Sequence, residues 1–296
     1  MKQKNKYLLI FLILSFFKIQ AQSITVTDSI SRQKLPYATV LYKGGGLYSD
    51  NNGQFSLNGI PAHKIKITYL GYEDFILHPS TYKNLTVGMV PKSMELPEVI
   101  LQTITKKVKI DFLKNTRDIG YFPLMNGHEI FMRIVPNKTN ANSIIEAVYF
   151  SFEKNSIREK SPSGQKIRIN IYNELDEKIY SEIKEIDAGR QKIKLILPEN
   201  KIQFHENGIG FGIELLDSVG NDENDPITRN LRLTGETSKE YNAETFYKYI
   251  FNNQENFHPL DQLTIETLGK NYNRKKNYSR NVNIAMDLIR NKDEQK

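Results

Sequence analysis

Short runs in which apolar and polar residues alternate recur along most of this chain, and they constrain its fold more than any other feature. The clearest case is Lys166–Tyr172, where Ile167, Ile169 and Ile171 alternate with Lys, Arg and Asn. Successive side chains of a β-strand point to opposite faces, so this pattern places one face in a core and the other in water. Gly, Pro, Asn and Asp separate the runs, and the whole pattern predicts an all-β protein.

The length of 296 residues indicates two domains, because one domain commonly has roughly 100–200 residues. Seven short runs between residues 23 and 101 predict a small antiparallel β-sandwich. Further runs predict a second β-sandwich at residues 119–268. We therefore expect two sandwiches in series.

Two segments lie outside these sandwiches. Residues 102–118 are expected to form a linker with a short helix, because Ile104, Val108 and Phe112 share one helical face. Residues 269–296 are expected to form a basic tail that contains a short helical segment.

The N-terminus has the plan of a secretory signal peptide. A basic start precedes an apolar run from Tyr7 to Phe17, and Ala21 provides a small residue for cleavage. As a helix this run would span roughly 16 Å, about half of a bilayer core. We expect residues 1–21 to be removed after Ala21 during export. Because the chain has no Cys, it is not expected to be a lipoprotein or to contain disulfides.

Residues 23–101 also carry an ordered series of five motifs. They are Val26-Thr27-Asp28, Leu35-Pro36 with Ala38-Thr39-Val40, Ser49-Asp50-Asn51-Asn52-Gly53-Gln54-Phe55-Ser56-Leu57, Ile67-Thr68-Tyr69-Leu70-Gly71-Tyr72-Glu73 and Leu96-Pro97-Glu98-Val99. This series resembles the carboxypeptidase regulatory-like domain of exported and outer-membrane proteins of Gram-negative bacteria. The resemblance implies a seven-stranded, transthyretin-like sandwich and carries no catalytic residue. Within it, Asn51-Asn52-Gly53 predicts a hairpin turn.

The second sandwich resembles the jelly-roll sandwiches of carbohydrate-binding modules in the order of its strands. One of these strands contains Gly208, Gly210 and Gly212, which run into Ile213 and Leu215 instead of opening a helix. A dinucleotide-binding loop requires the helix. We therefore interpret the glycines as positions in a strand that leave room for a neighbouring backbone or aromatic ring.

Two sets of residues in the second sandwich are candidate binding sites. The loop residues Asp217, Asp222 and Asp225 either hold Ca²⁺ or belong to a solvated acidic loop. The aromatic residues Tyr241, Tyr247 and Tyr249 either form a platform for a glycan or pack in the core. No other metal site and no cofactor is expected.

The net charge of +7 is concentrated at the two ends of the chain. Residues 1–21 carry four Lys and no acid, and residues 270–296 carry eight basic and three acidic residues. The body between them has a slight acidic excess, so nucleic acid is not an expected partner. The basic segment Lys270–Arg280 is expected to be a solubilising arm or a peripheral contact with an anionic membrane surface.

The sequence lacks the common signatures of hydrolytic enzymes. Neither the His-Glu-x-x-His motif of zinc peptidases nor the Gly-x-Ser-x-Gly elbow of serine hydrolases occurs. We expect a non-enzymatic, exported cell-envelope protein that serves as a protein-interaction or structural module in the periplasm or at the outer membrane. An outer-membrane or periplasmic protein is its expected partner, and edge-strand addition is a physical route for binding. A glycan-binding protein that acts through the second sandwich is the alternative, and an undetected hydrolase is the third hypothesis.

Overall fold

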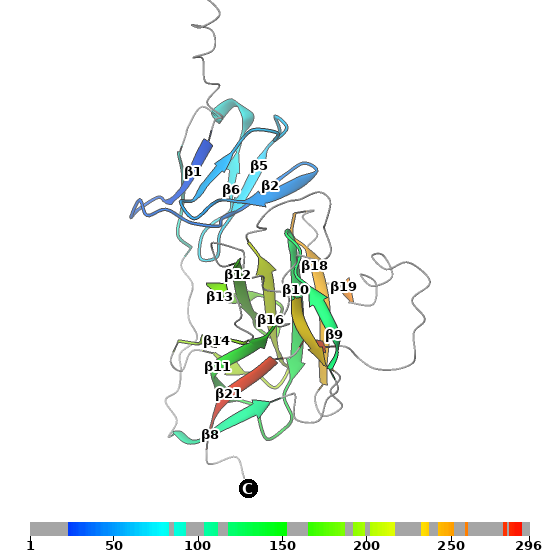
Figure 1. Cartoon of the computed structure of the whole chain (residues 1–296). Coiled ribbons are helices and arrows are strands. Elements are labelled where there is room, and N and C mark those ends of the chain that lie inside the picture. The colour runs from blue at the N-terminus through cyan, green and yellow to red at the C-terminus, as the bar shows by residue number, and fades with distance from the viewer. Residues whose placement is uncertain are drawn as a thin grey trace, which may run out of the picture. The chain divides into compact units, whose positions relative to one another are not determined.

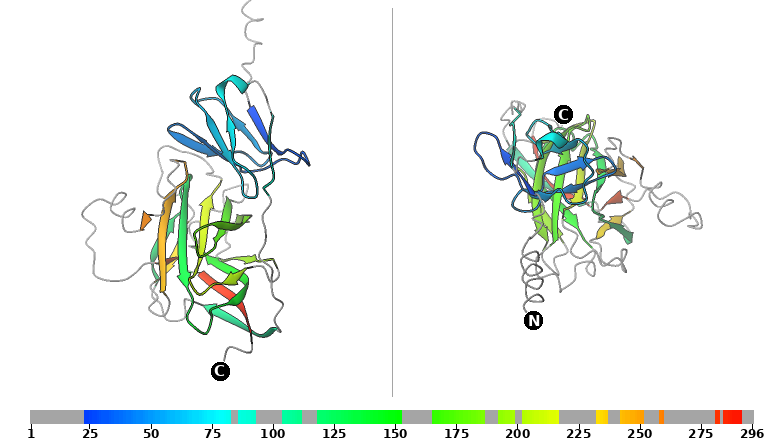
Figure 2. Two further views of the ribbon diagram at one scale, coloured as in Figure 1. Left: turned by 180° about the vertical axis from the view of Figure 1, so that it is seen from behind. Right: turned by 90° about the horizontal axis from the view of Figure 1, so that it is seen from above.

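The computed structural model describes residues 23–82, 86–92, 104–111, 118–152, 165–186, 192–198, 202–216, 232–236, 242–251, 258–259, 281–282 and 284–291. The expected signal peptide, residues 1–21, lies outside these ranges. The described chain is all-β and divides into two compact units, with the main boundary between Lys92 and Ser93 (Figure 1). Only the short segment Gly44–Leu47 is grouped with the second unit although it precedes that boundary. Figure 2 shows the first unit in blue to cyan and the second in green to red.

The first unit is a sandwich of a three-stranded sheet, ordered β4-β1-β7, and a four-stranded sheet, ordered β3-β2-β5-β6. Strand β1 is antiparallel to β4 and parallel to β7. The elements are β1 (Ser23–Asp28), β2 (Thr39–Tyr42), β3 (Gly45–Tyr48), β4 (Gln54–Ser56), β5 (Ile65–Thr68), β6 (Phe75–Leu77), the 3-10 helix η1 (Pro79–Thr81) and β7 (Thr86–Met89).

The core of the first unit follows the alternation in its sequence. Ile24 and Val26 of β1 are buried, as are Ile65 and Ile67 of β5, whereas the intervening Lys66 is half-buried. A turn at Asn51-Asn52-Gly53 is confirmed, but it is not a hairpin turn, because the flanking strands β3 and β4 belong to different sheets. Its Gly53 has a φ of 69°, a conformation that glycine adopts without a Cβ penalty.

One strand of the first unit was not anticipated. The Gly44-Gly45-Gly46 segment is read from the sequence as a break, but β3 begins at Gly45 and lies beside β2 in the sheet. Gly44 has a φ of 91°, which allows the chain to reverse between the two strands. The predicted seventh run, residues 99–101, lies outside the described residues.

The second unit contains a six-stranded sheet, ordered β13-β12-β16-β10-β18-β19, and a five-stranded sheet formed by β14-β11-β21-β8 with β15 beside β11. A three-stranded sheet, β20-β17-β9, completes it. The strands are β8 (Ile104–Asp111), β9 (Asp118–Pro123), β10 (His128–Val135), β11 (Ser143–Ser151), β12 (Gln165–Tyr172), β13 (Lys178–Ile186), β14 (Lys192–Ile196), β15 (Gln203–Phe204), β16 (Ile209–Leu215), β17 (Arg232–Glu236), β18 (Asn242–Tyr249), β19 (His258–Pro259), β20 (Asn281–Val282) and β21 (Ile284–Asn291).

The two larger sheets pack their apolar faces together. Ile167, Ile169 and Ile171 of β12 belong to one buried cluster with residues of β11, β14 and β21. The rings of Phe150 in β11 and Phe211 in β16 meet edge to face, with their centroids 6.4 Å apart. The second unit is therefore a β-sandwich whose core lies between these sheets.

The predicted helix in the linker, residues 102–118, is wrong. Residues 104–111 form β8, an edge strand of the five-stranded sheet that pairs with β21. Residues four apart share a face in a strand as well as in a helix, so the spacing of Ile104 and Val108 fits both. Lys107 and Lys109 are exposed, whereas Val108 is half-buried and Ile110 is buried, which is the alternation of a strand.

The predicted tail, residues 269–296, is wrong for its last part. Strand β21 lies inside the five-stranded sheet and pairs with β11 on one side and β8 on the other. Its Ile284, Met286 and Leu288 are buried, which is a period of two residues and not a helical period. The basic segment Lys270–Arg280 lies outside the described residues.

Candidate functional site

One face of the six-stranded sheet carries buried charged residues on the side opposite the core. Asn170 in β12 is 0% exposed, and Glu129 in β10 and Glu214 in β16 are each 1% exposed. A sheet face that does not contribute to the core usually carries solvated polar residues. Burial of a carboxylate is costly unless hydrogen bonds and opposite charges compensate for it, so this group is the most informative in the second unit.

The register of the strands brings these residues together. Glu129 and Glu214 are directly opposite each other in the β10-β16 pair. Like charges in that position repel each other. Arg168 in β12 is opposite Glu214 on its other side, and Asn170 is opposite Ser181 in β13. Four neighbouring strands thus contribute to one polar cluster.

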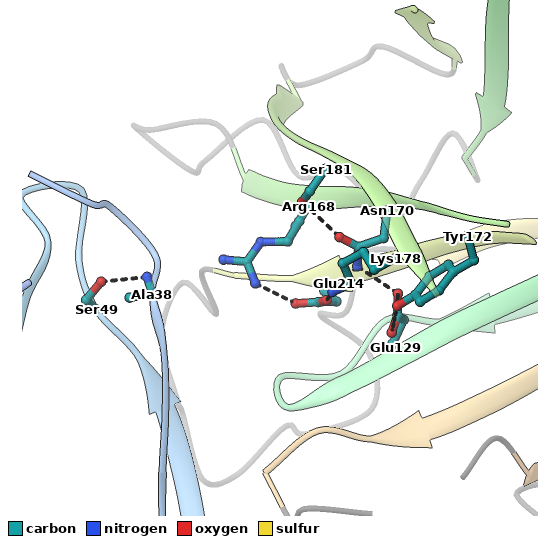
Figure 3. Close-up of polar contacts among 9 residues, drawn as sticks. All are labelled: Ala38, Ser49, Glu129, Arg168, Asn170, Tyr172, Lys178, Ser181 and Glu214. Atoms are coloured by element: carbon teal, nitrogen blue, oxygen red, sulfur yellow. Dashed lines mark hydrogen bonds and ion pairs between the residues drawn. The ribbon is translucent and has the colours of Figure 1, made fainter. Parts of the chain in front are cut away.

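Asn170 connects the two carboxylates (Figure 3). Its Nδ2 donates a hydrogen bond of 2.7 Å to Glu129 Oε1 and one of 2.6 Å to Glu214 Oε1. The Ser181 hydroxyl donates to Asn170 Oδ1 over 2.9 Å and so orients the amide. A single amide group therefore separates two carboxylates that would otherwise repel each other directly.

Other side chains also contact the carboxylate oxygens of Glu129 and Glu214. The Tyr172 hydroxyl lies 2.7 Å from both Oε1 and Oε2 of Glu129. Arg168 Nη1 is 3.0 Å from Glu214 Oε2, and Lys178 Nζ is 3.4 Å from Glu214 Oε1. Two acidic and two basic side chains thus balance in charge.

Burial determines how these groups ionise. It raises the pKa of Glu129 above the ordinary value, and the Glu214 charge adds to this, while Lys178 and the hydrogen bonds from Asn170 and Tyr172 act in the opposite direction. Burial and the two nearby carboxylates raise the pKa of Tyr172 well above 10.0. Tyr172 therefore keeps its proton and acts as a hydrogen-bond donor.

The glycines of β16 make room for this cluster. A Cβ at Gly210 would overlap the ring of Phe131, and one at Gly212 would overlap the carboxylate of Glu129. Both glycines are in a strand, and each leaves space for a side chain from β10. This confirms that the alternating glycines are packing positions.

Hydrogen bonds within the sheet already occupy the carboxylates of the cluster, and this limits the chemistry that the cluster can perform. Paired carboxylates can serve general acid–base catalysis when a substrate reaches them. Here all four carboxylate oxygens of Glu129 and Glu214 accept hydrogen bonds from side chains of the same sheet. This geometry supports a structural role, in which the cluster links β10, β12, β13 and β16.

Of the predicted site residues, the structure describes only Tyr247 and Tyr249. Asp217, Asp222, Asp225 and Tyr241 lie outside the described residues. In the described part of the chain, no three His, Asp or Glu residues are grouped so that they could hold a metal ion. Tyr247 is only 2% exposed and belongs to the core, so of the two alternatives given for it core packing holds and the glycan platform does not.

Tyr249, the third aromatic residue of that set, is half-buried. It packs against the core, with its ring edge to face with those of Tyr247 and His128. Tyr247 and Tyr249 are two residues apart in β18, so both lie on the face that packs against the core.

The first unit presents exposed apolar residues just after β1, just after β7 and within β6. Ile30 is 79% exposed, Val90 49% and Ile76 44%. Backbone hydrogen bonds join segments next to them: Ser29 N donates to Met89 O over 2.8 Å, and Glu73 N, three residues before Ile76, donates to Val90 O over 2.9 Å. We call Ile30, Ile76 and Val90 the apolar rim.

Asp28 holds the loop that carries Ile30. Its Oδ1 accepts the backbone N–H groups of Ile30 and Ser31 at 2.7 and 2.8 Å, and its Oδ2 accepts the Tyr72 hydroxyl at 2.8 Å. The hydrogen bonds from the Ser31 backbone and the Tyr72 hydroxyl lower the pKa of Asp28, despite its burial. Burial and the Asp28 charge raise the pKa of Tyr72 to about 12.

Within the described residues, no helix is both long and apolar enough to cross a membrane. Comparison with known proteins found no matching family model, no matching curated protein and no matching solved structure.

Proposed function

We propose that this chain is an exported, non-enzymatic protein of the cell envelope that binds a partner protein through its first unit. The periplasm or the outer membrane is its proposed place of action. The expected signal peptide and the resemblance of residues 23–101 to the carboxypeptidase regulatory-like domain support this location.

The apolar rim is the observation that carries the proposal. Five large aliphatic side chains are exposed in the described part of the chain, and Ile30, Ile76 and Val90 are three of them. An exposed apolar patch on a small domain commonly marks a protein interaction site. Burial of such a side chain contributes about 1.5–3 kcal/mol.

The sheet edge beside the rim offers hydrogen bonds as well. Strand β6 is at the end of the order β3-β2-β5-β6 formed by the described strands, and Ile76 is its central residue. An extended segment of a partner can add to such an edge through backbone hydrogen bonds. Exposed side chains such as Ile76 then contribute specificity.

The saturated cluster of the second unit fits this function. A group of side chains that bond to each other across four strands stiffens the sheet and leaves no carboxylate oxygen of Glu129 or Glu214 without a donor. In the proposed function the second unit is a rigid support and the first unit makes the partner contact.

The test is crosslinking and affinity purification of the tagged full chain from fractionated cells of its source. We compare the wild type with Ile30→Asp and Val90→Asp, and use Leu175→Asp as the matched control. Leu175 is 71% exposed in the turn between β12 and β13 of the second unit. Substitutions at exposed positions usually change stability by less than about 0.5 kcal/mol, so all variants should fold.

The expected result is one envelope protein that is recovered with the wild type and with Leu175→Asp. Its recovery should fall roughly tenfold or more with Ile30→Asp or Val90→Asp. Equal recovery with all variants, or recovery of the chain alone, would overturn the proposal for the apolar rim. Retention of the chain in the cytoplasmic fraction would overturn the proposed location.

A further inference from the structure

The outer face of the five-stranded sheet gathers lysines around one tyrosine. Tyr149 in β11 is opposite Lys194 in β14. On the other side of β11, Asp287 in β21 is opposite Lys109 in β8. These side chains belong to the face opposite the core, because they alternate with the buried Phe150, Leu195 and Met286.

Tyr149 holds two ammonium groups in place. Lys109 Nζ is 4.8 Å from the centre of the Tyr149 ring, and Lys194 Nζ is 5.4 Å from it. Such cation–π contacts favour an ammonium group over the ring face. The Tyr149 hydroxyl donates to Asp287 Oδ2 over 2.5 Å, which fixes the ring itself. Two lysines from different edges of the sheet thus meet at one aromatic residue.

The face has an excess of positive charge among its described residues. Lys107 and Lys109 in β8 and Lys192 and Lys194 in β14 are exposed or nearly so. Three acids belong to this face: Glu146 pairs with Lys107 at 2.6 Å, Asp287 lies 3.8 Å from Lys194, and Asp111 follows Lys109 by two residues in β8. The four lysines therefore leave an excess of one positive charge. We call these four lysines together with Tyr149 the basic face.

The lysines of the basic face form two rows. Residues two apart in a strand lie roughly 7 Å apart on the same face, which applies to Lys107 and Lys109 and to Lys192 and Lys194. Strands β14 and β8 are separated by β11 and β21, so the rows are roughly 14 Å apart. Charges repeated along a flat face match a ligand whose negative charges also repeat, and not a single small anion.

We propose that the basic face binds an acidic polysaccharide. The ammonium groups of Lys109 and Lys194 form ion pairs with its anionic groups, and the apolar surface of Tyr149 and the exposed Ile196 of β14 contacts the sugar rings. The choice of a polysaccharide among polyanions rests on the exported location proposed above. This is a second binding surface, on a different unit from the apolar rim.

Binding of the purified mature chain to polygalacturonate, a carboxylated polysaccharide, tests the proposal. Dextran is the neutral control polymer, and anionic phospholipid vesicles and duplex DNA are the competing polyanions. The variants are Lys109→Gln/Lys194→Gln and, as a control with the same loss of charge, Lys34→Gln/Lys64→Gln. Lys34 and Lys64 are exposed in the first unit.

The wild type should bind polygalacturonate and not dextran, with an affinity that falls as salt increases. Lys109→Gln/Lys194→Gln should weaken binding roughly tenfold, whereas the control pair should change it less than about twofold. Tyr149→Ala should also weaken binding although it removes no charge, because it releases both lysines. Circular dichroism verifies that each variant is folded.

Three results would overturn the proposal. They are no binding by the wild type, equal weakening by both lysine pairs, and tighter binding to the vesicles or to DNA than to polygalacturonate. This experiment needs neither the partner protein nor the source cells. Its failure is therefore distinguishable from a failure of the function proposed for the apolar rim.

Discussion

The carboxylate of Glu129 lies over the Cα atom of Gly212, in the space that a side chain at that position would occupy. A Cβ at Gly212 would be 2.7 Å from Cδ of Glu129 and 3.1 Å from its Cγ. This position lets Glu129 extend across β16 to Asn170 and Tyr172 in β12. The absence of a side chain at Gly212 is thus a condition for the polar cluster.

Gly212→Ala should therefore destabilise the second unit. The new methyl group displaces the Glu129 carboxylate from its donors, and overpacking of this kind costs about 1–3 kcal/mol in the free energy of unfolding. Urea denaturation followed by circular dichroism measures the change. In a Glu129→Ala background the same substitution should cost less, because the two effects are coupled. An equal cost in both backgrounds would show that Glu129 is not the cause.

Tyr172→Phe should lower the free energy of unfolding more than the same substitution at another tyrosine that donates a hydrogen bond to a carboxylate. It leaves Oε2 of the buried Glu129 without the Tyr172 donor, and an unsatisfied buried acceptor costs about 1–3 kcal/mol. The control is Tyr180→Phe, since Tyr180 donates to Glu182 over 2.6 Å on the half-buried edge strand β13. That change should cost less than about 1 kcal/mol. Equal costs in urea denaturation would contradict the role assigned to the cluster.

The loop that carries Ile30 should depend on pH through Asp28. Its folded-state pKa is below the ordinary 3.8, so ionised Asp28 stabilises the loop above that pH. This contribution is lost as the pH falls through the folded-state pKa. Near neutral pH, Asp28→Asn should speed amide hydrogen exchange at Ile30 and Ser31, and the difference from the wild type should shrink below pH 3.8. A difference that persists unchanged at low pH would refute this explanation.

Removal of the chain from Asn281 onward should unfold the second unit. This truncation deletes β21, which lies between β11 and β8 in the sheet. Its Ile284, Met286 and Leu288 are buried. Loss of three such side chains costs several kcal/mol, a large part of the stability of a domain. A shorter truncation after Asn291 retains every described strand and serves as the control. Native-like circular dichroism and soluble expression of the longer truncation would contradict the place of β21 in the sheet.

The strands and turns that could be predicted share a local cause. In β5 and β14 the alternation of apolar and polar residues matches an alternation of buried and more exposed side chains. In β12 the predicted water-facing side is wrong, because Arg168 and Asn170 are buried as well as the isoleucines. Asn51-Asn52-Gly53 specified its turn through the positive φ that Gly53 adopts. The packing role of Gly210 and Gly212 was also predictable, because apolar strand residues follow them.

Strands β8 and β21 were assigned incorrectly for different reasons. The pattern of β8 is ambiguous between helix and strand, and that of β21 follows a basic segment. Ile104 and Val108 are four residues apart, a spacing that occurs on one face of both a helix and a strand. In β21 the alternation of Ile284, Met286 and Leu288 follows a strongly basic segment, which suggested a tail. The partners of both strands are distant in sequence, since β21 pairs with β11 and β8.

The sequence by itself determined that this is an all-β protein of two sandwiches, because period-two alternation is a local property that each strand carries alone. Only the tertiary structure decided which polar residues meet. Glu129, Asn170 and Glu214 come from three strands, and their contact depends on the register of β10, β12 and β16. Tyr149, Lys109 and Lys194 likewise meet because β8 and β14 enter one sheet. Strand order arises from pairing between segments that are far apart in the sequence, and the alternation within one strand does not specify its partner.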